Sequence, residues 1–204
     1  MTRGYEVNVF GLTGNMGCGK STVGEILQRQ HSDVYLFDCD KVAKEEIFDK
    51  KNRKEIRKIL GDEVINKEKI AQLIFKNLDK KQALEKFIHP IVWKRLAEEI
   101  QKKDKNTIFL VESAIFFEIG KEKDIDKVIL VTCDLDKQKI RIKKRNNWSD
   151  EQINERLKCQ IPNELKTAKA WIVINNNCSL EELETKTEKL YLYMKDRNDY
   201  KLIL

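Results

Sequence analysis

The sequence has few of the features that stabilise small secreted proteins through disulfides or that allow a chain to cross a membrane. Its 204 residues include two prolines, two histidines and five cysteines, and no two cysteines form a C-x-x-C pair. Scattered cysteines of odd number argue against a disulfide framework and a zinc site, and are typical of reduced thiols in the cytosol. We expect no signal peptide, because the first residues lack its pattern, and no apolar run approaches the roughly 20 residues of a membrane span. We expect a soluble, cytoplasmic protein without a membrane partner.

Charge is abundant but mixed. Charged residues make up 36% of the chain and the formal net charge is +6, while the hydrophobic share of 41% suffices for a buried core. Lysines stand among acids at helical spacing, which indicates exposed helix faces. The charge does not by itself indicate nucleic-acid binding, and we expect no nucleic-acid partner. A small positive excess also suits polyphosphate ligands. The length fits one domain, 1–204, and the sequence leaves the oligomeric state open.

Short apolar runs alternate with helical patterns. Such runs are typical of buried strands, and they cover residues 7–12, 33–37, 108–111, 128–133 and 171–174. The order predicts an α/β fold: a five-stranded parallel sheet with helices on both faces and ligands beyond the carboxyl ends of the strands. Capping boxes start helices at Ser149 and Ser179.

The stretch 41–105 is predicted to be a helical insertion. Gly61 interrupts its pattern, and a further helix is expected over 70–76. Asp79 is predicted to cap the next helix, which is expected to stop near His89 and Pro90, because proline restricts the residue before it.

Residues 14–21 read G-N-M-G-C-G-K-S and match the phosphate-loop pattern G-x-x-x-x-G-K-S completely. A strand is predicted before the loop and a helix after it, so backbone N–H groups and the helix start would face one anion. Lys20 is expected to reach the β- and γ-phosphates, and the Ser21 hydroxyl to bind Mg²⁺. The predicted nucleotide contacts are Asn15, Met16, Gly17, Cys18, Gly19, Lys20, Ser21 and Thr22.

The loop alone does not separate kinases from GTPases and motor ATPases. A GTPase should also carry D-x-x-G after a strand and an N-K-x-D guanine reader, and the last predicted strand instead ends in Asn175, Asn176 and Asn177. The short chain and its long helical insertion favour a small-molecule kinase that uses ATP.

Acids follow two other strands. Asp38 and Asp40 alternate by two, so their side chains point the same way if the second strand stays extended. One would hold a water of Mg²⁺ while the other accepts the proton of an attacking hydroxyl; alternatively, Asp38 caps the next helix. Glu112 suits either a Mg²⁺-binding role or a structural hydrogen bond.

Arg141 and Arg145 are four residues apart and share a helix face. Guanidinium groups suit phosphate oxygens, so we predict that one of the two is catalytic, without choosing between them. Arg156 suits a salt bridge or a phosphate contact equally. Positive surroundings would favour the thiolate of Cys18, which reads as a small filler or a regulatory thiol.

Several of these segments together resemble the dephospho-CoA kinase family. They are G-L-T-G at 11–14, D-C-D at 38–40, E-K-F-I-H-P at 85–90, F-F-E at 116–118, the spaced Arg141, Arg145, Arg156 and Gln160, and V-I-N-N at 173–176. Their order matches the family over nearly the whole chain. Two positions depart from it, because Ala114 replaces a usual proline and Trp171 a common aspartate, so no acid is assigned there.

The resemblance implies transfer of the γ-phosphate of ATP to the ribose 3′-hydroxyl of dephospho-CoA, with Mg²⁺. It implies Asp40 as the base, and Asp38 and His89 are expected to contact the acceptor. Asn176 is a candidate for contact with the adenine. The resemblance also implies that the insert, 41–105, binds the acceptor and that 136–169 forms a lid. Without the resemblance, His89 reads as a helix terminator.

Two other functions remain open at this level. One is a kinase for a nucleoside monophosphate or another metabolite, since the phosphate loop serves all of these. The other is a non-catalytic nucleotide- or nucleic-acid-binding module that uses the basic surface, whose affinity would depend steeply on salt.

Overall fold

The computed structural model describes residues 7–61, 67–146, 148–196 and 202–204. The chain forms two compact units. One comprises Met1–Asp38 and Lys103–Leu204, and contains the sheet. The other is Cys39–Lys102 and is helical. Each unit is described by itself below.

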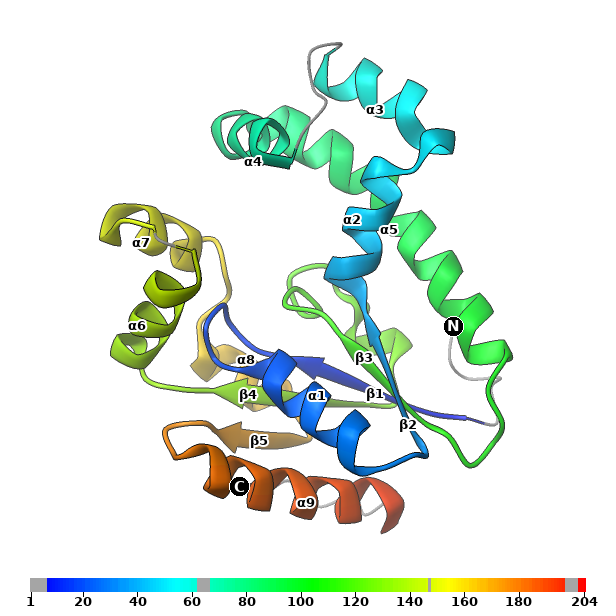
Figure 1. Ribbon diagram of the computed structural model, residues 1–204, viewed down its shortest axis with the longest axis vertical. Helices are drawn as coiled ribbons and strands as arrows, with labels where there is room; N and C mark the ends of the chain where they lie inside the picture. Colours follow the sequence, from blue (N-terminus) through cyan, green and yellow to red (C-terminus); the bar gives the residue numbers. More distant parts are fainter. Residues whose placement is uncertain (1–6, 62–66, 147, 197–201) are drawn as a thin grey trace. The chain divides into compact units, whose positions relative to one another are not determined.

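The first unit is built on a parallel sheet (Figure 1). Within the described residues the strand order is β2-β3-β1-β4-β5-β6, and every pair is parallel. The strands are β1 (Asn8–Thr13), β2 (Val34–Asp38), β3 (Ile108–Glu112), β4 (Lys127–Thr132), β5 (Ile172–Asn175) and β6 (Leu202–Ile203). The α/β class is confirmed, but the predicted number of five strands was wrong. The sequence could not reveal β6, because two residues are too few to show any periodicity.

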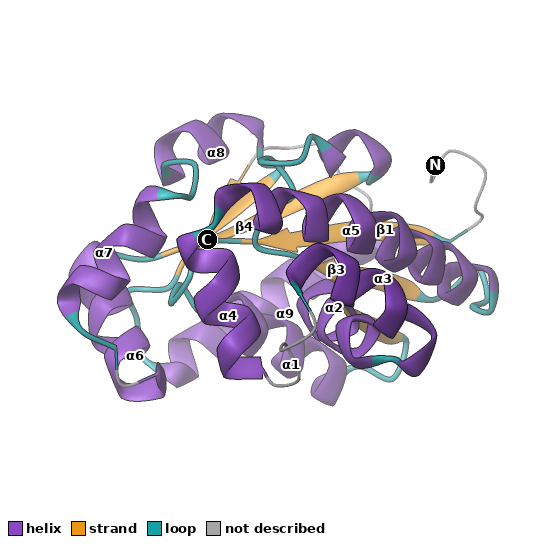
Figure 2. Cartoon of the chain, turned by 90° about the horizontal axis from the view of Figure 1, so that it is seen from above, coloured by secondary structure: helices purple, strands orange, loops and turns teal. Residues whose placement is uncertain are grey.

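Helices cover both faces of this sheet. α1 (Lys20–Gln30) and α9 (Leu180–Asp196) pack together on one face, and α8 (Asn163–Lys169) lies on the other (Figures 1 and 2). The core is the apolar interior between sheet and helices, formed by residues such as Leu12, Leu27, Leu110, Ile129, Ile174 and Leu190. The strands are apolar on both faces because both faces are covered.

The remaining elements of this unit are η2 (Lys121–Asp124), α6 (Leu135–Asn146) and α7 (Asp150–Lys158). The capping box at Ser149 is confirmed, because its hydroxyl accepts from the N–H of Gln152 and Gln152 accepts from the N–H of Ser149. The same exchange joins Ser179 and Glu182 at the start of α9. Both helix starts could be predicted because a capping box depends only on residues three positions apart.

The second unit overlaps the predicted insert, 41–105. Its elements are α2 (Cys39–Phe48), η1 (Lys50–Asn52), α3 (Arg53–Leu60), α4 (Lys67–Lys76) and α5 (Leu78–Gln101). The helix predicted over 70–76 is confirmed, and Gly61 ends α3 as expected, with its N–H donating to the carbonyl oxygen of Arg57.

The predicted course of α5 was wrong in two respects. Asn77, not Asp79, caps it, by accepting from the N–H of Lys80. The helix also does not stop near His89 but continues through Pro90 to Gln101. A proline removes one backbone hydrogen bond. Burial of five side chains at intervals of four residues outweighs that loss; they are Leu84, Ile88, Val92, Leu96 and Ile100.

The second strand also ends earlier than expected. β2 ends at Asp38, and α2 begins at Cys39, so Asp40 lies in the first turn of a helix. The condition under which both acids would point the same way, a strand that stays extended through Asp40, is therefore not met. The helix dipole favours a carboxylate in the first helical turn. The two-residue spacing of the acids fits this helical arrangement as well as an extended strand, so the spacing alone could not decide between them.

Central packing generates a testable expectation for stability. The side chain of Ile129 in β4 is fully buried, whereas Ile140 in α6 is 64% exposed. Ile129→Ala should lower the free energy of unfolding by about 2–5 kcal/mol, because it removes buried methyl groups and leaves a cavity. The matched variant Ile140→Ala should change it by about 0.5 kcal/mol or less. Urea unfolding measures both, and equal losses in the two variants would contradict this assignment of the core.

Candidate active site

The loop from Gly14 to Gly19 joins β1 to α1 at the carboxyl edge of the sheet. Glycine is required at both ends of the loop. A Cβ atom on Gly14 would clash with the carbonyl oxygen of Val131, so only glycine allows the loop to approach β4 this closely. Gly19 has φ 91°, a left-handed conformation that other residues rarely adopt. The sequence thus folds locally into the curled loop and helix start that bind phosphate groups.

The first turn of α1 is bound to the end of β3. The Ser21 hydroxyl donates to Oε1 of Glu112 at 2.5 Å, and Nζ of Lys20 lies 3.3 Å from the same oxygen. The predicted loop residue Thr22 lies in this turn as well. Glu112 therefore fixes the two side chains that the sequence assigns to phosphate and Mg²⁺.

Glu112 itself is 2% exposed. Burial raises the pKa of its carboxyl group, and the negative charge of Asp38 adds to this effect, while Lys20 and Ser21 oppose it. The sequence left Glu112 open between two roles, and the structure brings it to the loop. The sequence signal for this was its position directly after the apolar run 108–111, which predicted a strand. In the structure Glu112 is the last residue of β3 and pairs with Leu12 of β1.

The oxygens at this point suit Mg²⁺. The Ser21 hydroxyl and the Glu112 carboxylate are adjacent hard ligands, and Asp38 is near enough for its charge to act on Glu112. In the part of the chain that the structure describes, no group of three or more His, Cys, Asp or Glu residues forms a metal cage. Mg²⁺ needs no such cage, because it keeps several waters and takes further oxygens from substrate phosphates. The donor set therefore fits this ion.

Two further side chains support the loop from α6 and from the end of β5. Nδ2 of Asn176, which is buried, donates to the carbonyl oxygen of Cys18 at 2.7 Å. Arg141 donates to the carbonyl oxygen of Asn176 at 3.1 Å and to that of Cys18 at 3.5 Å. Arg145 instead is exposed and donates to the side chain of Asn146. Of the two predicted arginines, the structure brings Arg141 to the loop.

The opposite end of the predicted lid region also touches the loop. The backbone N–H of Met16 donates to Oε1 of Gln160 at 2.9 Å, and Nδ2 of Asn15 donates to the carbonyl oxygen of Ile161 at 3.3 Å. Arg156 lies elsewhere in this region, over the ring of Trp148 at 4.0 Å. The loop is thus held from both ends of 136–169.

An ion pair that the sequence did not suggest anchors this second contact. The side chain of Lys166 is fully buried and lies 2.7 Å from Oε1 of Glu118, which also accepts from the N–H of Ile161. Lys166 donates as well to the carbonyl oxygen of Ala114. Sequence reasoning missed Lys166 because a lysine in a charged helix is typical of solvent-exposed surface. In the sequence, the one available signal for this ion pair was the F-F-E segment, 116–118, which contains Glu118.

The thiol of Cys18 is buried inside the loop and accepts from Nε2 of Gln138 at 3.1 Å. A hydrogen bond from the thiol of Cys133 lowers the pKa of Cys18 and raises that of Cys133. The sulfur of Cys133 also lies 3.7 Å from the carbonyl oxygen of Gly17. The two thiols fill space beneath the loop and satisfy its polar atoms.

The helical unit holds two of the predicted acceptor-side residues. Asp40 lies in α2 and His89 in α5. Burial lowers the pKa of His89, and the negative charges of Glu85 and Asp40 oppose that shift. The two residues are therefore near enough within this unit for the charge of one to act on the other.

Comparison with known proteins gives a consistent result. The family model described as dephospho-CoA kinase matches residues 8–182. The chain is 32% identical over 190 residues to a dephospho-CoA kinase from Fusobacterium nucleatum, covering 90% of this chain and 97% of that protein. It is 33% identical over 191 residues to one from Aquifex aeolicus, covering 89% and 95%.

Solved structures agree. The protein TT1252 from Thermus thermophilus has a TM-score of 0.79 at 28% identity, with 91% of this chain and 97% of that one covered. A dephospho-CoA kinase from Campylobacter jejuni has a TM-score of 0.62 at 28% identity, with 93% and 98% covered. Thymidylate kinase from Candida albicans, at 15% identity, a TM-score of 0.53 and 94% of each chain covered, shares the fold alone.

The environment of His89 predicts a pH dependence of stability. Because burial lowers its pKa below the ordinary 6.5, the folded chain binds fewer protons here than the unfolded chain. Its contribution is fully present above pH 6.5 and is lost as the pH falls through the lowered pKa. The advantage of the wild type over His89→Gln should therefore be larger at pH 7.5 than at pH 5.5 in urea unfolding. A difference that does not change with pH would refute this account.

Proposed function

Because the chain belongs to the dephospho-CoA kinase family, we propose that it transfers the γ-phosphoryl group of ATP to the ribose 3′-hydroxyl of dephospho-CoA, giving CoA and ADP in the last step of coenzyme A biosynthesis. One observation carries the mechanism: Lys20 and Ser21, at the start of α1, are both held by the buried carboxylate of Glu112 beside a complete phosphate loop.

ATP binds through this loop. The N–H groups of residues 15–22 and the positive end of α1 hold the phosphates, and Lys20 reaches the β- and γ-phosphates. Ser21, with Glu112 and Asp38 nearby, would hold Mg²⁺, which supplies neutralisation of phosphate charge when it is bound. Asn176 fixes the carbonyl of Cys18, and through it the loop, on the side where we place the adenine.

Asp40 acts as the base. The 3′-oxygen of the acceptor forms a bond to the γ-phosphorus, the bond from that phosphorus to the β–γ bridging oxygen breaks, and ADP leaves. The proton of the hydroxyl passes to the Asp40 carboxylate. Support comes from the chain itself, since Asp40 stands two residues after the last residue of β2, at the carboxyl edge where ligands of such sheets bind.

Arginines of the lid region, 136–169, offset the charge of the transferring group. Arg141 is the stronger candidate, because its guanidinium already lies against the loop, where its partners are two backbone carbonyl oxygens rather than a carboxylate. Arg145 remains a second donor on the same helix. Closure of this region over the phosphates would exclude water, which otherwise competes as acceptor.

The insert, 41–105, holds the acceptor, with His89 and Asp38 as contacts. Support for His89 comes from its half-buried position within the electrostatic reach of Asp40. We propose that the enzyme acts in the cytoplasm and needs no nucleic acid, which fits its unpaired cysteines and mixed charge. Among the described helices, none has the length and apolarity to span a membrane.

A substrate panel tests the proposed activity. Purified protein with ATP and Mg²⁺ should release ADP when dephospho-CoA is present, and much less with UMP, CMP or adenosine, because the acceptor must fit the insert. Coupled detection of ADP measures this. Preference for a nucleoside monophosphate would defeat the assignment.

The proposed base is tested by Asp40→Asn. Turnover should fall by about 10²-fold or more because no carboxylate remains to accept the proton, while ATP affinity stays unchanged. Asp79→Asn is the matched control, since Asp79 is also an acid in the first turn of a helix in the same unit. Single-turnover kinetics and nucleotide titration give the two readouts. Near-normal turnover in Asp40→Asn would remove it as the base.

A further inference from the structure

Residues 160 and 161, between α7 and α8, hold the first half of the phosphate loop. Oε1 of Gln160 accepts from the N–H of Met16 at 2.9 Å, and the carbonyl oxygen of Ile161 accepts from Nδ2 of Asn15 at 3.3 Å. Asn15 is 8% exposed, so water has little access to the second contact. Two neighbouring residues of one segment thus fix two neighbouring residues of the loop.

The second half of the loop is held by other parts of the chain. The carbonyl oxygen of Cys18 accepts from Asn176 at the end of β5 and from Arg141 of α6. A shift of residues 160–161 would therefore remove both contacts of the first half while the second half kept its own. The curl of the loop depends on two separate supports, and 160–161 is one of them.

The segment 160–161 is itself anchored. The N–H of Ile161 donates to Oε1 of Glu118 at 3.2 Å, and the same oxygen lies 2.7 Å from Nζ of Lys166. Lys166 also donates to the carbonyl oxygen of Ala114 at 3.4 Å. An unbroken series of contacts therefore runs from α8 through Glu118 and Ile161 to the phosphate loop.

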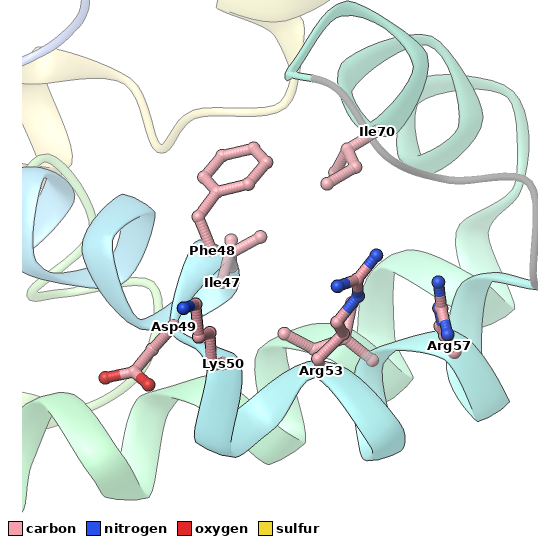
Figure 3. Close-up of a pocket in the computed structure, with 8 residues that line it drawn as sticks. Ile47, Phe48, Asp49, Lys50, Arg53, Arg57 and Ile70 are labelled. Carbon is pink, nitrogen blue, oxygen red and sulfur yellow. The ribbon is translucent and has the colours of Figure 1, made fainter.

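The burial of Lys166 calls for a reason other than stability. Long cationic side chains are usually exposed, as Lys50 and Arg53 are where they line a pocket of the helical unit (Figure 3). The side chain of Lys166 is instead fully buried. A buried ion pair is often no more stabilising than apolar residues of similar volume. What this pair does supply is a carboxylate oxygen in a fixed position opposite the N–H of Ile161.

We propose that Gln160 is a positioning residue for ATP, and that Glu118 and Lys166 act through Ile161 to keep it in place. The proposal rests on the proposed function, because it takes the loop to bind the phosphates of ATP. A loop that is already curled need not be ordered when ATP arrives, whereas a looser loop lowers the apparent affinity by the fraction of molecules that are curled. Bound ATP restores the curl, so turnover at saturating ATP is not affected.

Gln160→Met tests the contact with the loop. Methionine keeps the length of the side chain and removes the oxygen that accepts from Met16. The Kd and the KM for ATP should rise by about three- to tenfold, the loss expected for one hydrogen bond. The KM for dephospho-CoA and kcat at saturating ATP should not change. Calorimetric titration with ATP and Mg²⁺, without acceptor, and steady-state kinetics give these readouts. Gln28→Met is the matched control, because Gln28 is exposed in the last turn of α1, and it should behave as the wild type does.

Two double variants test the ion pair. Glu118→Gln with Lys166→Met removes both charges and keeps an oxygen opposite the N–H of Ile161, whereas Glu118→Leu with Lys166→Met removes that oxygen too. Neither leaves an unpaired buried charge, as replacement of Lys166 alone would. The variant with Leu should weaken ATP binding as Gln160→Met does, and the variant with Gln should bind ATP as the wild type does.

The outcomes separate the two proposals. A wild-type protein that shows no turnover dependent on ATP and dephospho-CoA overturns the proposed function. An active wild type with unchanged ATP affinity in Gln160→Met overturns the positioning role alone, and Gln160 is half-buried, so this variant decides even if a double variant does not fold. Equal ATP affinity in the two double variants, with a lower melting temperature in both, would show that the ion pair is merely structural.

Discussion

One constraint governs the first unit: the loop from Gly14 to Gly19 must stay curled, the conformation in which a phosphate loop turns its backbone N–H groups to one side. A loop in this conformation leaves carbonyl oxygens on its other side that need partners. Asn176 and Arg141 supply those partners for Cys18, and Gln138 meets its thiol. These residues are far from the loop in sequence, and the parallel order of the strands brings them to one edge of the sheet. The fold therefore serves to keep the loop curled.

Buried carboxylates organise both units in the same way. Glu112 holds Lys20 and Ser21 in the first unit, and Glu46 holds Arg95, Lys51 and Asn52 in the second. A buried carboxylate is costly unless it is paired, so each one imposes a fixed geometry on its partners.

Features encoded by near neighbours in the chain could be predicted. The glycine spacing of the loop, the capping boxes and the apolar strands all depend on residues within a few positions of one another, and all are confirmed. Features decided by tertiary packing could not. α5 continues through Pro90 because distant helices bury its apolar side, and Lys166 is buried because Glu118, 48 positions earlier, neutralises it. The role of Asp40 stays a prediction, and only its helical setting is now known.

The enclosure of Lys166 has an evolutionary consequence. A buried ammonium that loses its carboxylate is left as an uncompensated charge, at a cost of about 3–5 kcal/mol, whereas replacing both partners with apolar residues of similar volume is often tolerated. Positions 118 and 166 should therefore drift together across homologous chains, as a charged couple or an apolar one. Lineages with only one half of the couple should be rare, because either intermediate weakens the corner on which Ile161 rests.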